Sequence, residues 1–76
     1  MKETIRKMIE EALPLVDVDS EFLFGELDSL GITTILMMIS EKYGIEIGYT
    51  DVTPRNFKTI ETLTQLVETK IKEQKG

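Results

Sequence analysis

The segment from Asp28 to Gly44 constrains the fold most, because it contains the signals for one complete helix in the middle of a short chain. Asp28 is a favourable N-cap, since its carboxylate can accept hydrogen bonds from the free N–H groups of a first helical turn. Gly44 is suited to end the helix in a left-handed conformation. Between the two, apolar residues recur at helical spacing within one sector, which predicts a side that faces the core. The residues of that sector are Ile32, Ile35, Leu36, Ile39 and Tyr43.

A second sector of the same helix combines apolar and polar residues and is predicted to face solvent. Leu30 and Met37 lie in it, close to Ser29. The other members of the sector are Thr33, Thr34 and Glu41. Ser29 is predicted at about the first helical position, at the positive end of the helix dipole, where a phosphate group is stabilised. The pattern therefore predicts a serine that is well placed to bear a phosphate.

Charge is distributed unevenly along the chain. Residues 17–53 carry eight acidic groups against Lys42 alone, a net charge of −7, whereas residues 1–16 are neutral and residues 54–76 carry +2. The acidity is thus concentrated around the helix that Ser29 opens. Such a surface repels nucleic acid and favours basic patches on partner proteins. The alternative is that the acidity serves only the solubility of a small domain.

Composition excludes several classes of site. The chain contains no cysteine and no histidine, which leaves no disulfide and no zinc-ligand spacing. No apolar run is long enough for a membrane span, and the N-terminus lacks the hydrophobic region of a signal peptide. From these features we expect a cytoplasmic monomer with no membrane span, no metal site and no nucleic-acid partner.

Helical spacing predicts two further long helices, one on each side of the central one. The first covers residues 2–13 and ends before Pro14, because the residue before a proline disfavours the helical conformation. The last covers residues 60–74 and is capped by Thr59. A long loop, residues 17–27, follows the first helix, and its apolar side chains, Leu23 above all, are expected to pack into the core.

The predicted fold is all-α, a small antiparallel four-helix bundle of three main helices and one short helix. The short helix is expected over residues 54–57, because Thr53 is a good cap and Pro54 suits the first helical position. Residues 45–47 are predicted to be extended and to anchor on the core. The predicted core is Ile5, Met8, Ile9, Leu13, Leu23, Ile32, Ile35, Leu36, Ile39, Tyr43, Ile47, Phe57, Ile60, Leu63 and Val67.

Two motifs carry a resemblance to a known family. Asp28-Ser29-Leu30 opens the central helix, and Glu41-Lys42-Tyr43-Gly44-Ile45-Glu46-Ile47 closes it. In these segments, and over nearly its whole length, the chain resembles the acyl carrier proteins. The segment Pro54-Arg55-Asn56-Phe57 resembles the corresponding region of aminoacyl and peptidyl carriers. The tripeptide alone is a weak signal, but its mid-chain position and flanking helices favour a carrier over a plain capped helix.

The resemblance implies that Ser29 carries 4′-phosphopantetheine through a phosphodiester, with Asp28 and Leu30 as the flanking motif. The thiol of this arm would hold acyl or aminoacyl groups as thioesters. Residues 1–76 would then form one carrier domain, whose partners are a phosphopantetheinyl transferase, a loading ligase and downstream synthase or transferase enzymes.

The resemblance also implies that partners recognise the central helix. Helical periodicity assigns that surface to Leu30, Thr33 and Met37, bordered by Glu41. Two positions depart from fatty-acid-type carriers, since Gly31 and Thr34 stand where those carriers usually have acidic residues. A glycine directly after Asp-Ser-Leu, as at Gly31, is a feature in which the chain resembles the D-alanyl carrier branch. Glycine within a helix costs about 1 kcal/mol of stability relative to alanine, which suggests that a partner or the arm approaches closely at this position. Fatty acid, polyketide, nonribosomal-peptide-like and D-alanyl pathways all stay open.

Catalysis by the chain itself is disfavoured, because Ser29 has no candidate base and would be a poor nucleophile unaided. We therefore predict no catalytic residue and regard the chain as a substrate of enzymes. The main alternative is a small acidic helical interaction domain without a prosthetic group. A ubiquitin-like modifier is suggested only by length and the terminal Gly76, and it requires a β-rich fold that the helical spacing disfavours. A helix-turn-helix DNA-binding protein is disfavoured by the acidic centre.

Overall fold

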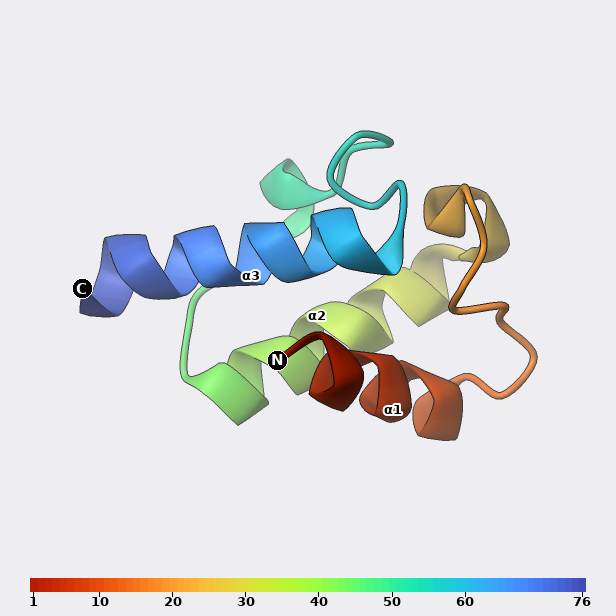
Figure 1. Cartoon of the computed structure of the whole chain (residues 1–76), viewed down its shortest axis with the longest axis horizontal. Coiled ribbons are helices and arrows are strands. Elements are labelled where there is room, and N and C mark those ends of the chain that lie inside the picture. Colours follow the sequence, from red (N-terminus) through yellow and green to blue (C-terminus); the bar gives the residue numbers. More distant parts are fainter.

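The computed structural model describes all 76 residues and contains three α-helices and two short 3-10 helices (Figure 1). The α-helices are α1 (Lys2–Ala12), α2 (Ser29–Tyr43) and α3 (Ile60–Lys75). The 3-10 helices are η1 (Leu23–Glu26) and η2 (Tyr49–Asp51). There is no strand, which agrees with the predicted all-α class. None of the helices combines the length and the hydrophobicity that a membrane crossing requires.

The direction of the helices differs from the prediction in one respect. In Figure 1, α1 runs opposite to α2, but α2 and α3 run the same way. α1 is therefore antiparallel to both other helices, whereas α2 and α3 are parallel to each other. The reason lies in the long connection of residues 44–59, which returns the chain to the end of the molecule where α2 began, so that α3 starts beside the start of α2.

The ends of the helices follow the predicted capping signals. The Thr62 N–H donates to Thr59 Oγ1 at 3.2 Å, and the Thr59 N–H donates to Thr62 Oγ1 at 3.0 Å, so the two threonines cap α3 reciprocally. Gly44 ends α2 with φ of 61°, a left-handed conformation that a side chain disfavours. α1 ends at Ala12, one residue before the predicted end, and the Leu13 N–H still donates to the Ile9 carbonyl at 2.8 Å.

The loop between α1 and α2 contains η1, a short helix that the sequence reading assigned to loop. Its first residue, Leu23, is fully buried, as predicted. The Leu23 N–H donates to the Lys58 carbonyl at 2.6 Å, and the Phe24 N–H donates to the Phe57 carbonyl at 2.8 Å. These two hydrogen bonds join η1 to the segment just before α3.

The predicted short helix over residues 54–57 is matched only in part. This segment forms one turn, in which the Asn56 N–H donates to Thr53 Oγ1 at 3.0 Å and the Phe57 N–H donates to the Thr53 carbonyl at 3.0 Å. The cap is therefore present, but the helix does not continue. The backbone is extended again at Thr59, with φ of −138° and ψ of 168°, and the Phe57 and Lys58 carbonyls accept from η1.

The connection after α2 is fixed by the last turns of α3. Gln74 pairs with the backbone of Glu46, since Gln74 Oε1 accepts from the Glu46 N–H at 2.7 Å and its amide donates to the Glu46 carbonyl at 2.8 Å. Lys70 lies 3.0 Å from Asp51 of η2, and both side chains are mostly buried. The Asp51 carboxylate raises the pKa of Lys70. η2 is thereby held against α3.

The core agrees with the predicted face of each helix. Ten of the fifteen predicted core residues are buried, and the other five, Met8, Leu13, Ile32, Tyr43 and Ile47, are partly buried against them. Two buried apolar residues lie outside the helices, Val18 and Ile45. Val18 was missing from the prediction, because no periodicity marks it, whereas Ile45 belongs to the segment that is expected to anchor on the core. The twelve apolar residues of the buried cluster are Ile5, Ile9, Val18, Leu23, Ile35, Leu36, Ile39, Ile45, Phe57, Ile60, Leu63 and Val67.

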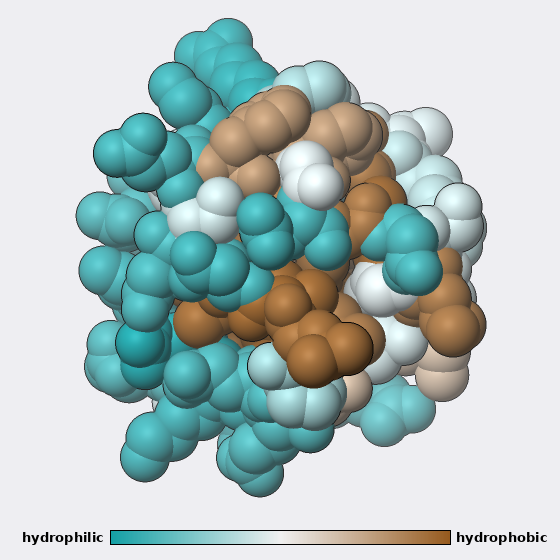
Figure 2. Space-filling view, turned by 90° about the vertical axis from the view of Figure 1, so that its right-hand side faces the viewer, coloured by the Kyte–Doolittle hydropathy of each residue, from teal (hydrophilic) through white to brown (hydrophobic).

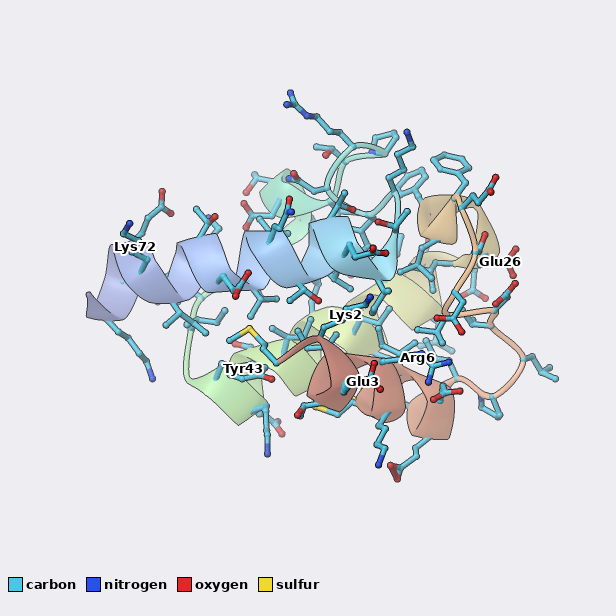
Figure 3. All side chains as sticks on the ribbon, in the orientation of Figure 1. Lys2, Glu3, Arg6, Glu26, Tyr43 and Lys72 are labelled. Atoms are coloured by element: carbon cyan, nitrogen blue, oxygen red, sulfur yellow. The ribbon has the colours of Figure 1, made fainter.

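An ion pair on the surface fixes the loop to α1. Arg6 points from α1 towards this loop (Figure 3) and contacts Asp19 through two hydrogen bonds, Nε to Oδ1 at 3.0 Å and Nη2 to Oδ2 at 2.6 Å. The hydrogen bond from Arg6 lowers the pKa of Asp19 below its ordinary value. Val18, which precedes Asp19, is buried, so the pair holds the loop where Val18 enters the core.

Asp19→Asn should destabilise the fold in a pH-dependent way. Because the pKa of Asp19 is lower in the folded chain, its charge stabilises the fold above the ordinary carboxyl pKa of 3.8, and this contribution is lost as the pH falls through the folded pKa. Urea denaturation should show the variant less stable than the parent at pH 7, with the two curves converging in acid. Glu21→Gln, a control at an exposed carboxylate outside the ion pairs, should change little. A difference that stays constant across the pH range would contradict this account.

Candidate functional site

The first turn of α2 has the geometry that the sequence predicted. Asp28 is extended, with φ of −96° and ψ of −179°, and its Oδ1 accepts from the Gly31 N–H at 2.7 Å. The first helical residue is Ser29, and its side chain is exposed. The N–H groups of Ser29 and Leu30 belong to the first turn, where a helix supplies no acceptor of its own. An anion on the Ser29 oxygen would lie at the positive end of the helix.

The hydroxyl of Ser29 is free of internal partners. The backbone carbonyl of this residue accepts from Thr33 Oγ1 at 2.9 Å, but Ser29 Oγ takes part in no hydrogen bond. Asp28, the nearest carboxylate in sequence, is committed to the Gly31 N–H. No base therefore contacts the hydroxyl within this chain. The oxygen is accessible, and this chain supplies no base that would activate it as a nucleophile.

The residues predicted for partner recognition lie on one side of α2. Leu30 is 74 % exposed and Met37 is 58 % exposed, although both are large and apolar. Glu41 is exposed further along the helix, and Thr33 is half-buried between Leu30 and Met37. The predicted exposure is confirmed for Leu30, Met37 and Glu41, and only in part for Thr33. We call them the α2 face.

Tyr49 was missed by the sequence reading, which treated it as loop. It is the first residue of η2, and its hydroxyl contacts Thr33 Oγ1. The ring is 64 % exposed. It therefore enlarges the α2 face with an aromatic side chain that comes from the connection after the helix. The sequence around Tyr49 does not indicate this contact, because Thr33 lies sixteen residues earlier in the chain.

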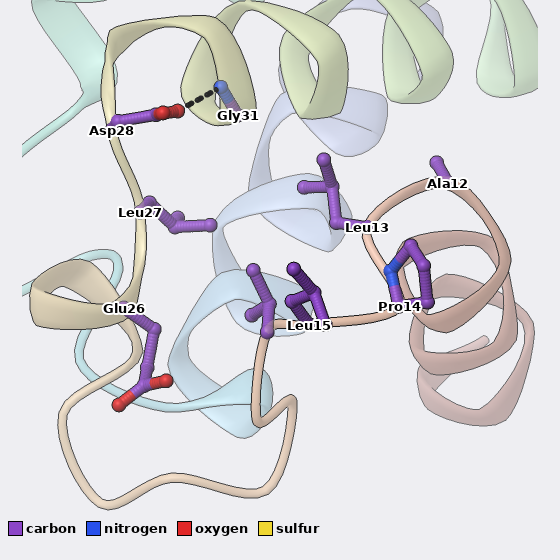
Figure 4. Close-up of a pocket in the computed structure, with 9 residues that line it drawn as sticks. Ala12, Leu13, Pro14, Leu15, Glu26, Leu27, Asp28 and Gly31 are labelled. Carbon is purple, nitrogen blue, oxygen red and sulfur yellow. Dashed lines mark hydrogen bonds between the residues drawn. The ribbon is translucent and has the colours of Figure 1, made fainter.

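A hollow of about 370 Å³ lies on the other side of Ser29, between the end of α1 and the start of α2 (Figure 4). Asp28 and Gly31 form one wall of it, so the hollow begins within two residues of Ser29. The other residues that line it are Ala12, Leu13, Pro14, Leu15, Val16, Glu26 and Leu27. No pattern in the sequence indicates this hollow, because its walls come from two separate stretches, residues 12–16 and 26–31.

Gly31 is buried at this hollow. A Cβ atom at Gly31 would lie 3.5 Å from Leu27 Cδ2 and 3.6 Å from Leu13 Cδ1, which are ordinary contacts, and 3.2 Å from Asp28 Oδ1, which is tight. Asp28 is exposed and can move by a few tenths of an ångström. The absence of a side chain at Gly31 therefore leaves space in the hollow rather than relieving a backbone clash.

Comparison with protein-family models gives one match, the model described as "Phosphopantetheine attachment site", over residues 3–69. This range includes most of the 76 residues and all of α2. The chain belongs to this family. Neither the curated proteins nor the solved structures include a significant match.

Membership in the phosphopantetheine-attachment family establishes the cofactor and the general role. Domains of this family are the sites where 4′-phosphopantetheine is attached covalently, and they act as carriers rather than catalysts. Carrier domains interact with phosphopantetheinyl transferases and with synthase enzymes. The residues at the start of α2 suit such a group, because an exposed serine oxygen lies at a helix N-terminus and no acidic side chain lies within the first turn itself.

Gly31→Ala should raise the free energy of unfolding by about 0.5–1 kcal/mol, because alanine favours the helix, the methyl group meets ordinary contacts at Leu27 and Leu13, and the exposed Asp28 side chain can yield at its tight contact of 3.2 Å. Chemical denaturation followed by circular dichroism would measure the change. Gly44→Ala is the matched control and should destabilise the chain, since Gly44 has φ of +61° and a Cβ there would lie 2.9 Å from Lys75 Nζ. A loss of stability in Gly31→Ala would show that the contact with Asp28 disrupts the cap.

Proposed function

We propose that this chain is an acyl or aminoacyl carrier in which Ser29 bears 4′-phosphopantetheine. The observation that supports this most is the position of Ser29, exposed at the first residue of α2 and directly after the Asp28 cap, within a chain of the phosphopantetheine-attachment family. The terminal thiol of the arm would hold the cargo as a thioester. The role of Asp28 and Leu30 is to flank the serine, one as the cap and the other as an exposed apolar neighbour.

Attachment would require a phosphopantetheinyl transferase that uses coenzyme A. In that step the Ser29 oxygen forms the new bond to phosphorus, the bond between the two phosphates of coenzyme A breaks, adenosine 3′,5′-bisphosphate leaves, and the hydroxyl proton passes to the transferase or to water. This chain contributes position rather than base catalysis, because the Ser29 hydroxyl has no internal hydrogen bond. The first-turn N–H groups of α2 would stabilise the bound phosphate.

Partner selection would depend on the α2 face. The part of α2 from Ser29 to Ser40 carries no charged side chain. Acidic residues flank this uncharged stretch, with Glu26 and Asp28 before it and Glu41 after it. Leu30 and Met37 therefore dominate the exposed surface. Partners would dock through apolar contacts, with basic groups placed at the two ends of the helix.

An aminoacyl or D-alanyl cargo is our preferred assignment among the possible thioesters. The neutral α2 lacks the acidic residues that fatty-acid-type carriers usually have at the positions of Gly31 and Thr34. Thr34 instead donates its hydroxyl to the Leu30 carbonyl at 2.8 Å. An adenylating ligase that loads amino acids would then be the loading partner, whereas a ketosynthase partner would indicate a polyketide or fatty acyl cargo.

The carrier function predicts a specific covalent modification. Incubation with coenzyme A, magnesium and a broad-specificity phosphopantetheinyl transferase should add one phosphopantetheinyl group to the parent and none to Ser29→Ala, as read from the intact mass. Ser20 and Ser40 are the other serines of the chain, and Ser20→Ala should be modified like the parent.

A folded parent that gains no mass would overturn the carrier assignment. It would favour the alternative of an acidic interaction domain without a prosthetic group. Retention of the modification in Ser29→Ala would instead show that another residue bears the arm.

A further inference from the structure

The hollow between α1 and α2 has the character of an interaction site that the α2 face does not include. Its walls are mainly apolar, with Leu13, Val16 and Leu27 among them, and Leu15 at its edge is 99 % exposed. Figure 4 shows Leu13 and Leu27 directed into the same space. Figure 2, which views the side of the molecule where the loop and the start of α2 lie, shows hydrophobic surface in the middle of this side, with hydrophilic surface mainly to its left and below it. The exposed Leu15 side chain and the apolar hollow beside it together offer an apolar surface that a partner protein could cover.

The polar groups of the hollow are all acidic. Glu26 and Asp28 are the two charged residues that line it, and no lysine or arginine does. Asp28 accepts from the Gly31 N–H at 2.7 Å, but Glu26 accepts only a long hydrogen bond, 3.4 Å, from the Asp17 N–H. Both carboxylates retain oxygen lone pairs for a further donor. The hollow therefore favours an apolar group that has basic groups next to it.

The position of the hollow links it to Ser29. Gly31 lies two residues after Ser29, which corresponds to about 3 Å along the helix axis. Leu30 begins the α2 face on one side of the serine, and the hollow begins on the other. An enzyme that brings its reactive groups to the Ser29 oxygen must therefore cover part of both surfaces.

We propose that the hollow is a second docking contact for the enzyme that modifies Ser29, a proposal that rests on the carrier function above. It accepts an apolar anchor side chain of the phosphopantetheinyl transferase, and lysine or arginine residues beside that anchor pair with Glu26 and Asp28. The exposure of Leu15 favours a protein over the tethered arm itself, because a group inside the hollow would leave Leu15 in water whereas a protein surface would cover it.

Transfer kinetics would test this contact. With coenzyme A and the transferase, Leu15→Asp and Glu26→Lys should each raise the KM for the carrier about tenfold, with kcat within about twofold of the parent, because each removes binding without altering the reacting atoms. Leu15→Met keeps the apolar surface and should behave like the parent. Glu68→Lys changes the same charge at an exposed position on α3 and should also leave KM unchanged. Circular dichroism would verify that each variant is folded.

Three results would overturn the proposal. A KM for Leu15→Asp within twofold of the parent would show that the hollow is not a docking contact, without contradicting the carrier function. A fall in kcat with unchanged KM would assign the hollow to the chemical step instead of to docking. Shifts of the Leu13, Leu15 and Val16 methyl signals upon attachment of the arm, seen by NMR with no enzyme present, would identify the arm as the occupant. No modification of the parent is a different outcome, since it would remove the carrier function and this proposal together.

Discussion

The hydrogen bond from the Gly31 N–H to the Asp28 carboxylate fixes where α2 begins, and the features around Ser29 depend on that point. One residue of shift along a helix turns each side chain by about 100°. Such a shift would move Leu30 and Met37 away from the exposed side and Ile39 away from the core. The cap therefore sets two properties at once, an exposed serine at the positive end of the helix and an apolar face beside it.

The rest of the chain supports this start from two directions. η1 precedes Asp28 and is held by backbone hydrogen bonds to the segment before α3, so the loop enters α2 from a fixed position. After α2, Gln74 and Lys70 of α3 hold the connection that carries Tyr49 back to Thr33. A domain of this size has a small core. The fold is therefore stabilised by polar contacts between loops and helices in addition to the twelve buried apolar residues of the core.

Local signals predicted the helices well, because caps and helical spacing act over a few residues. Asp28, Gly44 and Thr59 marked real helix ends, and the exposed positions of Leu30 and Met37 followed from the same spacing. The short helix expected over residues 54–57 is matched only by a turn, and the Phe57 and Lys58 carbonyls at its end pair with η1, thirty or more residues earlier. The hollow and the contact between Tyr49 and Thr33 also depend on segments that are distant in sequence. Contacts between distant segments follow from tertiary packing, and the helical periodicity of the sequence contains no information about them.

The account is tested most directly by comparing ¹H–¹⁵N NMR spectra of the chain before and after treatment with coenzyme A and a phosphopantetheinyl transferase. If α2 is already arranged to receive a phosphate, the largest shifts should fall on the N–H signals of Ser29, Leu30 and Gly31, while the signals of α1 and α3 stay in place. An unchanged spectrum, or shifts centred on another part of the chain, would contradict the claim that the capped start of α2 is the attachment site.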